Sequence, residues 1–142
     1  MIVKQVSVFL ENKSGRLNEV TQILGDAGLN MSAFTIADTS DFGILRLIVS
    51  DPERAKELLK KNNFAVQSTE VVLVKTPNHP GGLVKMLNVL NDENVFIEYM
   101  YAFSHSDETA IIVLRPTDLK KCYDILQNHQ DDFLVQDGQY LF

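Results

Sequence analysis

The sequence predicts an α+β protein built from two copies of one small βαββαβ unit. Three observations lead to this fold class: the chain repeats itself, each copy alternates strand-like with helix-like apolar patterns, and turn residues separate these patterns at matching places. Gly15 and Leu17 match Gly81 and Leu83 at a distance of 66 residues, and the distance grows to 69 residues near the end of each copy. Insertions in loops explain this drift, so the repeat predicts two similar modules.

The first predicted module, residues 1–69, opens with a strand at Val6–Leu10, where alternate residues are apolar. Apolar residues at helical spacing from Leu17 to Ala27 then predict a helix, which Gly28 is placed to end. The later elements are, in order, a strand at 31–37, a turn at 39–41, a strand at 42–49, a helix from Asp51 and Pro52 to about Lys61, and a short strand that begins at 64–66.

The second predicted module, residues 70–142, repeats this order. Its elements are a strand at 71–75, a helix at 82–93, strands at 95–103 and 108–114, a helix at 118–130 that Asp118 caps, and a strand at 133–135. The order βαββαβ is typical of ferredoxin-like folds and predicts, in each module, an antiparallel sheet with two helices on one face. Because a unit of about 70 residues buries little surface alone, we expect the modules, or two chains, to pack side by side or face to face.

Composition narrows the classes of function. Apolar residues make up 45% of the chain, enough for a core, and the net charge of −6 opposes nucleic acid or an anionic membrane as the main partner. Cys122 is the only cysteine, so no intrachain disulfide can form, and its place in an apolar helical pattern predicts a buried thiol rather than a reactive one. No apolar stretch approaches the ~20 residues of a membrane span, so we expect a cytoplasmic protein.

The residues that usually carry catalysis are not grouped in this sequence. The chain has no GxGxxG, P-loop, HExxH, CxxC or GxSxG motif. His79, His105 and His129 lie far apart along the chain, which does not suggest a metal site, and the carboxylates are dispersed. We therefore expect no catalytic residues, no bound metal and no cofactor.

A strand–glycine–helix corner occurs twice, as ENKSGRL at residues 11–17 and as PNHPGGL at residues 77–83. Glycine lets the backbone approach a ligand closely, and the first amides of the following helix are unpaired donors that can hold a carboxylate. Asn12 and Asn78 take equivalent places and offer both a donor and an acceptor, as recognition of an α-amino acid requires. The alternative is that asparagine and glycine merely make a tight turn.

Two further features have both a structural and a functional interpretation. Arg46 interrupts an apolar strand, so its side chain either points into a module interface or lies at a solvated edge. Tyr99, Met100, Tyr101 and Phe103 form a bulky stretch, which is either sheet core and module interface or the wall of a pocket for an apolar side chain.

The string N-x-x-G-x-L after an alternating strand, followed by a helix and then G-L-N-M, resembles the ACT domain, a βαββαβ amino-acid-sensing module attached to many biosynthetic enzymes. The second copy, N-H-P-G-G-L, is closer still to the N-x-P-G-x-L turn that is usual in this family. The resemblance covers nearly all of the 142 residues as two modules, without an attached catalytic domain.

In the ACT family the effector usually sits at an interface between two modules, held by the first strand–helix turn of one and the start of the second strand of the other. The resemblance therefore implies ligand-binding residues in both copies: Asn12, Ser14, Gly15, Arg16, Leu17, Asn30 and Met31 in the first, and Asn78, His79, Pro80, Gly81, Gly82, Leu83, Phe96 and Ile97 in the second. Ser14 replaces the proline that is frequent in the family, and Phe96 stands where the first copy has Asn30. These departures predict two unequal sites.

The resemblance implies a stand-alone regulatory protein that binds an amino acid or a related small carboxylate, forms a homodimer and alters the activity of an enzyme partner. We expect ligand binding to shift an equilibrium at an interface, through a difference in affinity for two states. Two alternatives stay open: a ligand-free module for protein interaction or transcription regulation, and a small enzyme of ferredoxin-like fold, which the missing catalytic residues disfavour. The sequence names neither the ligand nor the partner.

Overall fold

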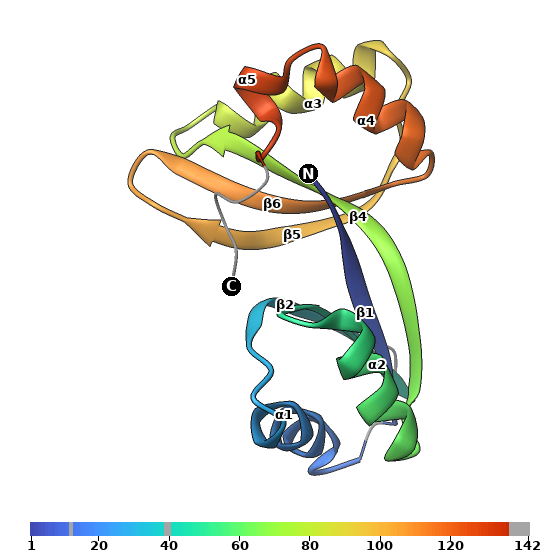
Figure 1. Cartoon of the computed structure of the whole chain (residues 1–142). Coiled ribbons are helices and arrows are strands. Elements are labelled where there is room, and N and C mark those ends of the chain that lie inside the picture. The colour runs from blue at the N-terminus through green and yellow to red at the C-terminus, as the bar shows by residue number, and fades with distance from the viewer. Residues whose placement is uncertain (12, 39–40, 137–142) are drawn as a thin grey trace. The chain divides into compact units, whose positions relative to one another are not determined.

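The computed structural model describes residues 1–11, 13–38 and 41–136 (Figure 1). The chain divides into two compact units: the N-terminal unit, residues 4–69, and the C-terminal unit, which begins at Glu70 and also takes in Met1–Val3. Because a compact unit need not fold alone, the predicted division into domains between residues 69 and 70 stays a prediction.

In the N-terminal unit the predicted order of helices and strands is confirmed, while residues 39 and 40 of the predicted turn at 39–41 lie outside the described residues. The unit contains β1 (Ile2–Glu11) from residue 4 onward, α1 (Arg16–Asp26), β2 (Met31–Asp38), β3 (Phe42–Val49), α2 (Pro52–Lys61) and the first part of β4 (Ala65–Pro77). β3 pairs antiparallel with β1 on one side and with β2 on the other, so that Leu47 lies opposite both Val6 and Phe34. β2 is therefore an edge strand of this sheet.

Local chemistry explains where the helices begin and end. Asp51 stands before α2, and its side chain accepts a hydrogen bond from the amide of Arg54 at 3.0 Å. Asp118 caps α4 (Leu119–Gln127) in the same way, with the amide of Lys121 as donor at 3.0 Å. Gly28 follows α1 with a φ of 71°, a left-handed conformation that glycine adopts without strain. The predicted caps and the predicted helix end are thus confirmed.

The C-terminal unit repeats the order of the first up to its last element, where a short helix takes the place of the strand. It contains the rest of β4, α3 (Gly82–Asp92), β5 (Ile97–His105), β6 (Thr109–Pro116), α4 and the short α5 (Gln130–Phe133). β6 pairs antiparallel with β4 and β5, so that Leu114 lies opposite both Val72 and Met100. On the other side of β4, the Leu73 amide donates a hydrogen bond to the Met1 carbonyl at 2.8 Å. The predicted fold class, two βαββαβ modules with antiparallel sheets, is confirmed.

The strands predicted from residue 64 and at 71–75 are one continuous strand, β4. No glycine or proline interrupts the chain between Ala65 and Thr76, so nothing in the local sequence ends the extended conformation there. The last strand of the first module and the first strand of the second are consequently a single element.

The strand predicted at 133–135 is wrong. The amides of Asp132 and Phe133 both donate to the carbonyl of His129, which keeps the chain helical through α5, and only Leu134 forms an isolated bridge, with Val74. Phe133, Leu134 and Val135 are all buried. A short apolar run indicates that a segment is buried. The same run occurs in strands, at helix ends and in irregular segments, so it does not identify the conformation.

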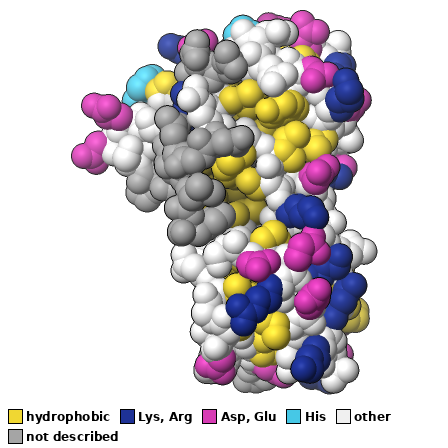
Figure 2. Space-filling view, in the orientation of Figure 1, with side chains coloured by type: hydrophobic (Ala, Val, Ile, Leu, Met, Phe, Trp, Pro, Cys, Tyr) yellow, Lys and Arg dark blue, Asp and Glu magenta, His cyan; other side chains and the backbone are white. Residues whose placement is uncertain are grey.

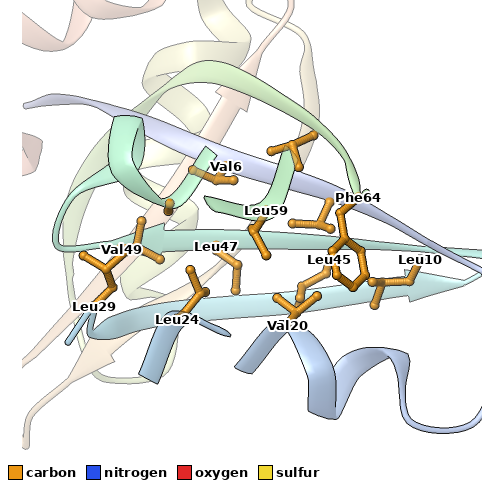
Figure 3. Packing of buried hydrophobic residues seen from close by; sticks show 13 residues of the cluster. Val6, Leu10, Val20, Leu24, Leu29, Leu45, Leu47, Val49, Leu59 and Phe64 are labelled. Atoms are coloured by element: carbon orange, nitrogen blue, oxygen red, sulfur yellow. The ribbon is translucent and has the colours of Figure 1, made fainter. Parts of the chain in front are cut away.

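Each unit has its own apolar core. In the N-terminal unit, Val20 and Leu24 of α1 and Leu59 of α2 pack with Leu45 and Leu47 of β3 (Figure 3). All five side chains are at most 1% exposed. The core of the C-terminal unit draws in the same way on α3, α4, β4 and β6. The two long helices of each unit therefore pack on one face of its sheet, as predicted.

The other face of the sheet in the N-terminal unit carries a row of polar residues. Arg46 of β3 lies opposite Ser7 of β1 and Thr35 of β2. Gln5 and Ser7 are buried, and Gln5 Nε2 donates a hydrogen bond to Ser7 Oγ at 3.2 Å. Because β3 lies between β1 and β2, Arg46 does not take the solvated edge position that the sequence allowed.

Candidate functional site

The corner between β1 and α1 shapes a candidate site in the N-terminal unit. Gly15 stands directly before α1 with a φ of 86°, in the left-handed conformation that favours glycine. Among the described residues no side chain caps α1 with a hydrogen bond. The amides of its first turn therefore point out of the helix without an intrahelical acceptor and carry a positive partial charge.

Two hollows lie beside this corner, between α1 and β2. The charged hollow, of about 200 Å³, is lined by Leu10, Glu11, Lys13, Arg16, Leu17, Ile36 and Gly43. The apolar hollow, of about 140 Å³, is lined by Leu17, Thr21, Met31, Phe34, Leu45 and Leu47. Leu17 lines both hollows, so a charged region and an apolar region adjoin at this residue.

Charges of both signs surround the charged hollow. Lys13 Nζ lies 2.8 Å from Glu11 Oε2, and Arg16 Nη1 lies 3.1 Å from Glu19 Oε2. The hydrogen bond and the charge of Lys13 lower the pKa of Glu11, so this carboxylate is ionised at neutral pH. The Arg16 guanidinium also lies 4.9 Å from the centre of the Phe64 ring, a cation–π contact that orients it. Figure 2 shows Lys and Arg side chains interspersed with Asp and Glu over the N-terminal unit on the face drawn there.

The corner between β4 and α3 is held by contacts of its own. Gly81 precedes α3 with a φ of 83°, like the glycine of the first corner. The side chain of Asn78 donates a hydrogen bond from Nδ2 to the Ser106 carbonyl at 2.6 Å, which ties the corner to the turn between β5 and β6. Gly82 is buried, and a Cβ atom at this residue would lie 2.0 Å from the Pro77 carbonyl oxygen. At Gly82 the start of α3 is thus packed directly against the backbone at the end of β4.

Comparison with known proteins decides the family. A family model described as an ACT domain pair matches residues 1–140. The chain belongs to the ACT domain pair family. The resemblance stated from the sequence is therefore confirmed, and we name the two compact units the N-terminal and C-terminal ACT modules.

Solved structures share this fold. A protein from Bacteroides thetaiotaomicron is 51% identical in its crystal structure, with a TM-score of 0.88, and the match covers 94% of this chain and 92% of that one. The regulatory subunit of aspartate kinase from Thermus thermophilus is 12% identical with a TM-score of 0.63, and that from Thermus flavus is 15% identical with a TM-score of 0.62. Each of these two matches covers 90% of this chain and 94% of the other, and at this identity they show the fold alone. No curated protein is similar enough to count as a match.

In the N-terminal ACT module the structure brings three predicted ligand-binding residues to the hollows. Arg16 lines the charged hollow, Met31 lines the apolar hollow and Leu17 lines both. Of the others, Ser14, Gly15 and Asn30 are exposed, and Asn12 lies outside the described residues. That these residues bind a ligand stays a prediction.

In the C-terminal ACT module two other hollows, of about 430 and 380 Å³, lie on and beside α3 and α4, and none of the predicted residues lines them. Asn78, His79, Pro80 and Gly81 form an exposed turn, Gly82 is buried, Leu83 and Ile97 pack partly buried on the core, and Phe96 is 71% exposed. The Phe96 carbonyl accepts a hydrogen bond from the Thr117 amide at 3.0 Å, as the Asn30 carbonyl does from the Ser50 amide at 3.0 Å. The backbone therefore repeats at this point although the side chains differ.

Several residues that line the hollows were not predicted from the sequence, above all Thr21 and Phe34. The repeat held a signal for Thr21, whereas the place of Phe34 follows only from the structure. Thr21 falls one turn after Leu17 on the apolar face of its helix, where the second copy has Leu87. Phe34 is exposed on β2 although it lies opposite the buried Leu47, which indicates that the helices leave this part of the sheet uncovered.

Other kinds of site have little support. Within the described ranges, no three His, Cys, Asp or Glu side chains gather in a way that could hold a metal ion. No helix of the part of the chain that the structure describes is long and apolar enough to cross a membrane.

Cys122 lies in the core of the C-terminal ACT module and is fully buried, which confirms the predicted burial. Burial raises the pKa of its thiol to about 11, and the charge of Asp118 acts in the same direction. The thiol is therefore protonated at neutral pH, a state in which it is a poor nucleophile.

We expect the stability of the C-terminal ACT module to fall as the pH rises from about 9 to about 11. The thiol of Cys122 ionises near pH 9.0 in the unfolded chain but stays protonated up to about 11 in the folded one, so alkaline pH favours unfolding by about 2–3 kcal/mol. Urea unfolding at about pH 8 and about pH 10.5 measures this loss. Cys122→Ala is the control and should lose less stability between the two pH values; an equal loss in both proteins would contradict the prediction.

Proposed function

We propose that this ACT domain pair is a regulatory protein that binds an amino acid, or a related small carboxylate, at the corner between β1 and α1. The observation that carries the proposal is the meeting of the charged hollow and the apolar hollow at Leu17. An α-amino acid has the corresponding parts, because its carboxylate, ammonium group and side chain all branch from one carbon atom. Sites for small molecules typically combine an apolar lining with a few polar groups that orient the ligand.

Each part of an amino acid has a counterpart in the N-terminal ACT module. Arg16 and Lys13 attract the carboxylate, and the start of α1, which no described side chain caps, adds a favourable potential. The ionised Glu11 attracts the ammonium group. The ligand side chain enters the apolar hollow, where each Å² of buried apolar surface favours binding by about 25 cal/mol.

The proposal includes a homodimer. Phe34 and Ile36 are 62% and 44% exposed on the edge strand β2, and they line the apolar and the charged hollow, respectively. An edge strand with exposed apolar side chains is suited to association with a second copy, which would cover the open side of the hollows. A ligand held at such an interface favours one arrangement of the two chains over another, and this difference is what the regulation of an enzyme partner requires.

A cytoplasmic location is also part of the proposal, supported by the single cysteine of the chain, which is a buried thiol. The exposed Phe34 and Ile36 favour a second candidate function, a ligand-free module that binds another protein through this edge. The two candidates differ in whether a small molecule stabilises the protein.

A thermal-shift screen against the proteinogenic amino acids tests the proposal. We expect at least one amino acid to raise the melting temperature, because a ligand at 100 times its Kd stabilises the folded state by about 2.7 kcal/mol. Arg16→Gln should reduce this increase, because it removes one of the two cations that attract the carboxylate.

Lys120→Gln is the matched control for Arg16→Gln. Lys120 also forms an ion pair within one helix, with Asp124 at 2.9 Å, but it lies on α4 and lines a separate hollow of the C-terminal ACT module, not the charged or the apolar hollow. This variant should keep the full ligand-induced increase. If no amino acid stabilises a dimeric sample of the unmodified protein, the proposal is contradicted and the ligand-free module is favoured.

A further inference from the structure

We propose that the amino acid binds in the N-terminal ACT module alone, that its side chain is apolar, and that Thr21 keeps the apolar hollow open. This inference rests on the proposed function and deepens it by assigning the module, the class of ligand and the residue that limits its size. Because the chain is a repeat, each residue that lines the hollows has an equivalent in the C-terminal ACT module.

The charged residues of the first corner have no charged equivalents in the second. Residues that line the charged hollow match residues of the second corner at a distance of 66 positions: Glu11 matches Pro77, Lys13 matches His79, and Arg16 matches Gly82. A zwitterionic ligand would therefore lose both the cations for its carboxylate and the anion for its ammonium group. The C-terminal ACT module lacks the groups that would orient an amino acid at this corner.

Backbone contacts also leave no room for a side chain at residue 82, the position in the second corner that matches Arg16. A Cβ atom at Gly82 would lie 2.0 Å from the Pro77 carbonyl oxygen, so an arginine could not replace this glycine without moving the backbone. The Asn78 side chain donates its hydrogen bond to the Ser106 carbonyl. The contact of Gly82 with Pro77 and the hydrogen bond of Asn78 thus hold β4, α3 and the turn after β5 together.

The linings of the apolar regions differ most at one position. Strand pairing and the repeat relate the lining residues as follows: Leu17 to Leu83, Thr21 to Leu87, Met31 to Ile97, Phe34 to Met100, Leu45 to Ile112, and Leu47 to Leu114. Thr21 is the one polar residue of the first set and the shortest, whereas Leu87 reaches further and packs partly buried on the core of its module. A leucine therefore occupies space in the C-terminal ACT module that the N-terminal one leaves empty.

The hydroxyl proton of Thr21 is engaged within α1 and is not offered to a ligand side chain. Its hydroxyl donates a hydrogen bond to the Asn18 carbonyl one turn earlier in α1, at 2.9 Å. The remaining residues of the apolar hollow, among them Met31 and Phe34, offer apolar surface only. The hollow consequently suits an apolar ligand side chain, and the size of residue 21 limits how much of that side chain can enter.

Isothermal titration calorimetry with L-leucine, L-methionine and L-phenylalanine as probes, and with L-serine and L-aspartate as comparisons, tests the inference. We expect one bound molecule per chain and a preference for the apolar probes. Thr21→Leu and the larger Thr21→Phe should weaken binding at least about tenfold, because they fill the space for the ligand side chain. Thr21→Ser, which keeps the hydroxyl and leaves the space, should bind within about threefold of the unmodified protein.

Leu87→Thr is the matched control in the C-terminal ACT module. It should leave the affinity and the count of one molecule per chain unchanged, because the charged residues stay absent there. Three results would each overturn the inference while leaving the proposed function intact. They are two bound molecules per chain, undiminished binding by both Thr21→Leu and Thr21→Phe, and a preference for L-serine or L-aspartate. Failure of every amino acid to bind the unmodified protein would overturn the proposed function and the inference together.

Discussion

Replacing Gly82 by alanine is expected to destabilise the C-terminal ACT module by about 3 kcal/mol or more, at the upper end for overpacked sites. The added Cβ would lie 2.0 Å from the Pro77 carbonyl oxygen and 3.0 Å from its carbonyl carbon. Both atoms belong to the backbone of β4, so no side-chain rotation relieves the contact. Either the end of β4 or the start of α3 must move, and the turn that Asn78 ties to Ser106 moves with it.

Gly25→Ala is the control for this substitution. Gly25 lies inside α1, and a Cβ atom there meets nothing within 4 Å, so the same change should stabilise the N-terminal ACT module by about 0.5–1 kcal/mol through helix propensity. Urea unfolding of both variants measures the two effects. A small loss for Gly82→Ala, similar in size to the gain for Gly25→Ala, would show that the backbone at this corner yields easily and would contradict the prediction.

Most of the fold could be predicted because the signals that define it are local. Asp51, Asp118 and Gly28 set helix ends through hydrogen bonds and backbone conformations that involve only their near neighbours. The repeat then placed the same elements in the second copy, including α3 and β6. The continuity of β4 and the helical turn before Leu134 escaped prediction, since strand-like and merely buried apolar segments share one pattern.

The candidate site was predictable only in part, for a different reason. The hollows are lined by residues of α1, β2 and β3, and which of these approach one another depends on how the helices lie on the sheet. Leu17 and Met31 could be predicted from the family pattern, and the structure brings them to one hollow. Thr21 belongs to no sequence motif. Only the folded structure shows that it lines the apolar hollow, whereas the equivalent Leu87 packs on the core of its own module. The hydrogen bond from the Asn78 side chain to the Ser106 carbonyl joins residues 28 positions apart in the sequence, and no short motif predicts it.

Replacing Leu24 or Leu90 by alanine is expected to destabilise the protein by about 2–5 kcal/mol, the usual range for a fully buried leucine. The two leucines are equivalent in the repeat, on α1 and α3, and are 0% and 1% exposed. They belong to separate core clusters that have no residue in common, and neither lines the hollows. Each substitution should therefore loosen one ACT module and leave the ligand contacts of the first corner in place.

Hydrogen exchange followed by mass spectrometry separates a local effect from a global one. Leu24→Ala should speed exchange in α1, α2 and β3, and Leu90→Ala in α3, α4 and β6, because a cavity weakens the cluster that surrounds it. In the double variant the two losses of free energy should add within about 0.5 kcal/mol, as they do for sites without shared neighbours. Faster exchange throughout the described chain in both single variants, or a clearly non-additive double variant, would instead mean that β4, which runs through both modules, makes them unfold as one cooperative unit.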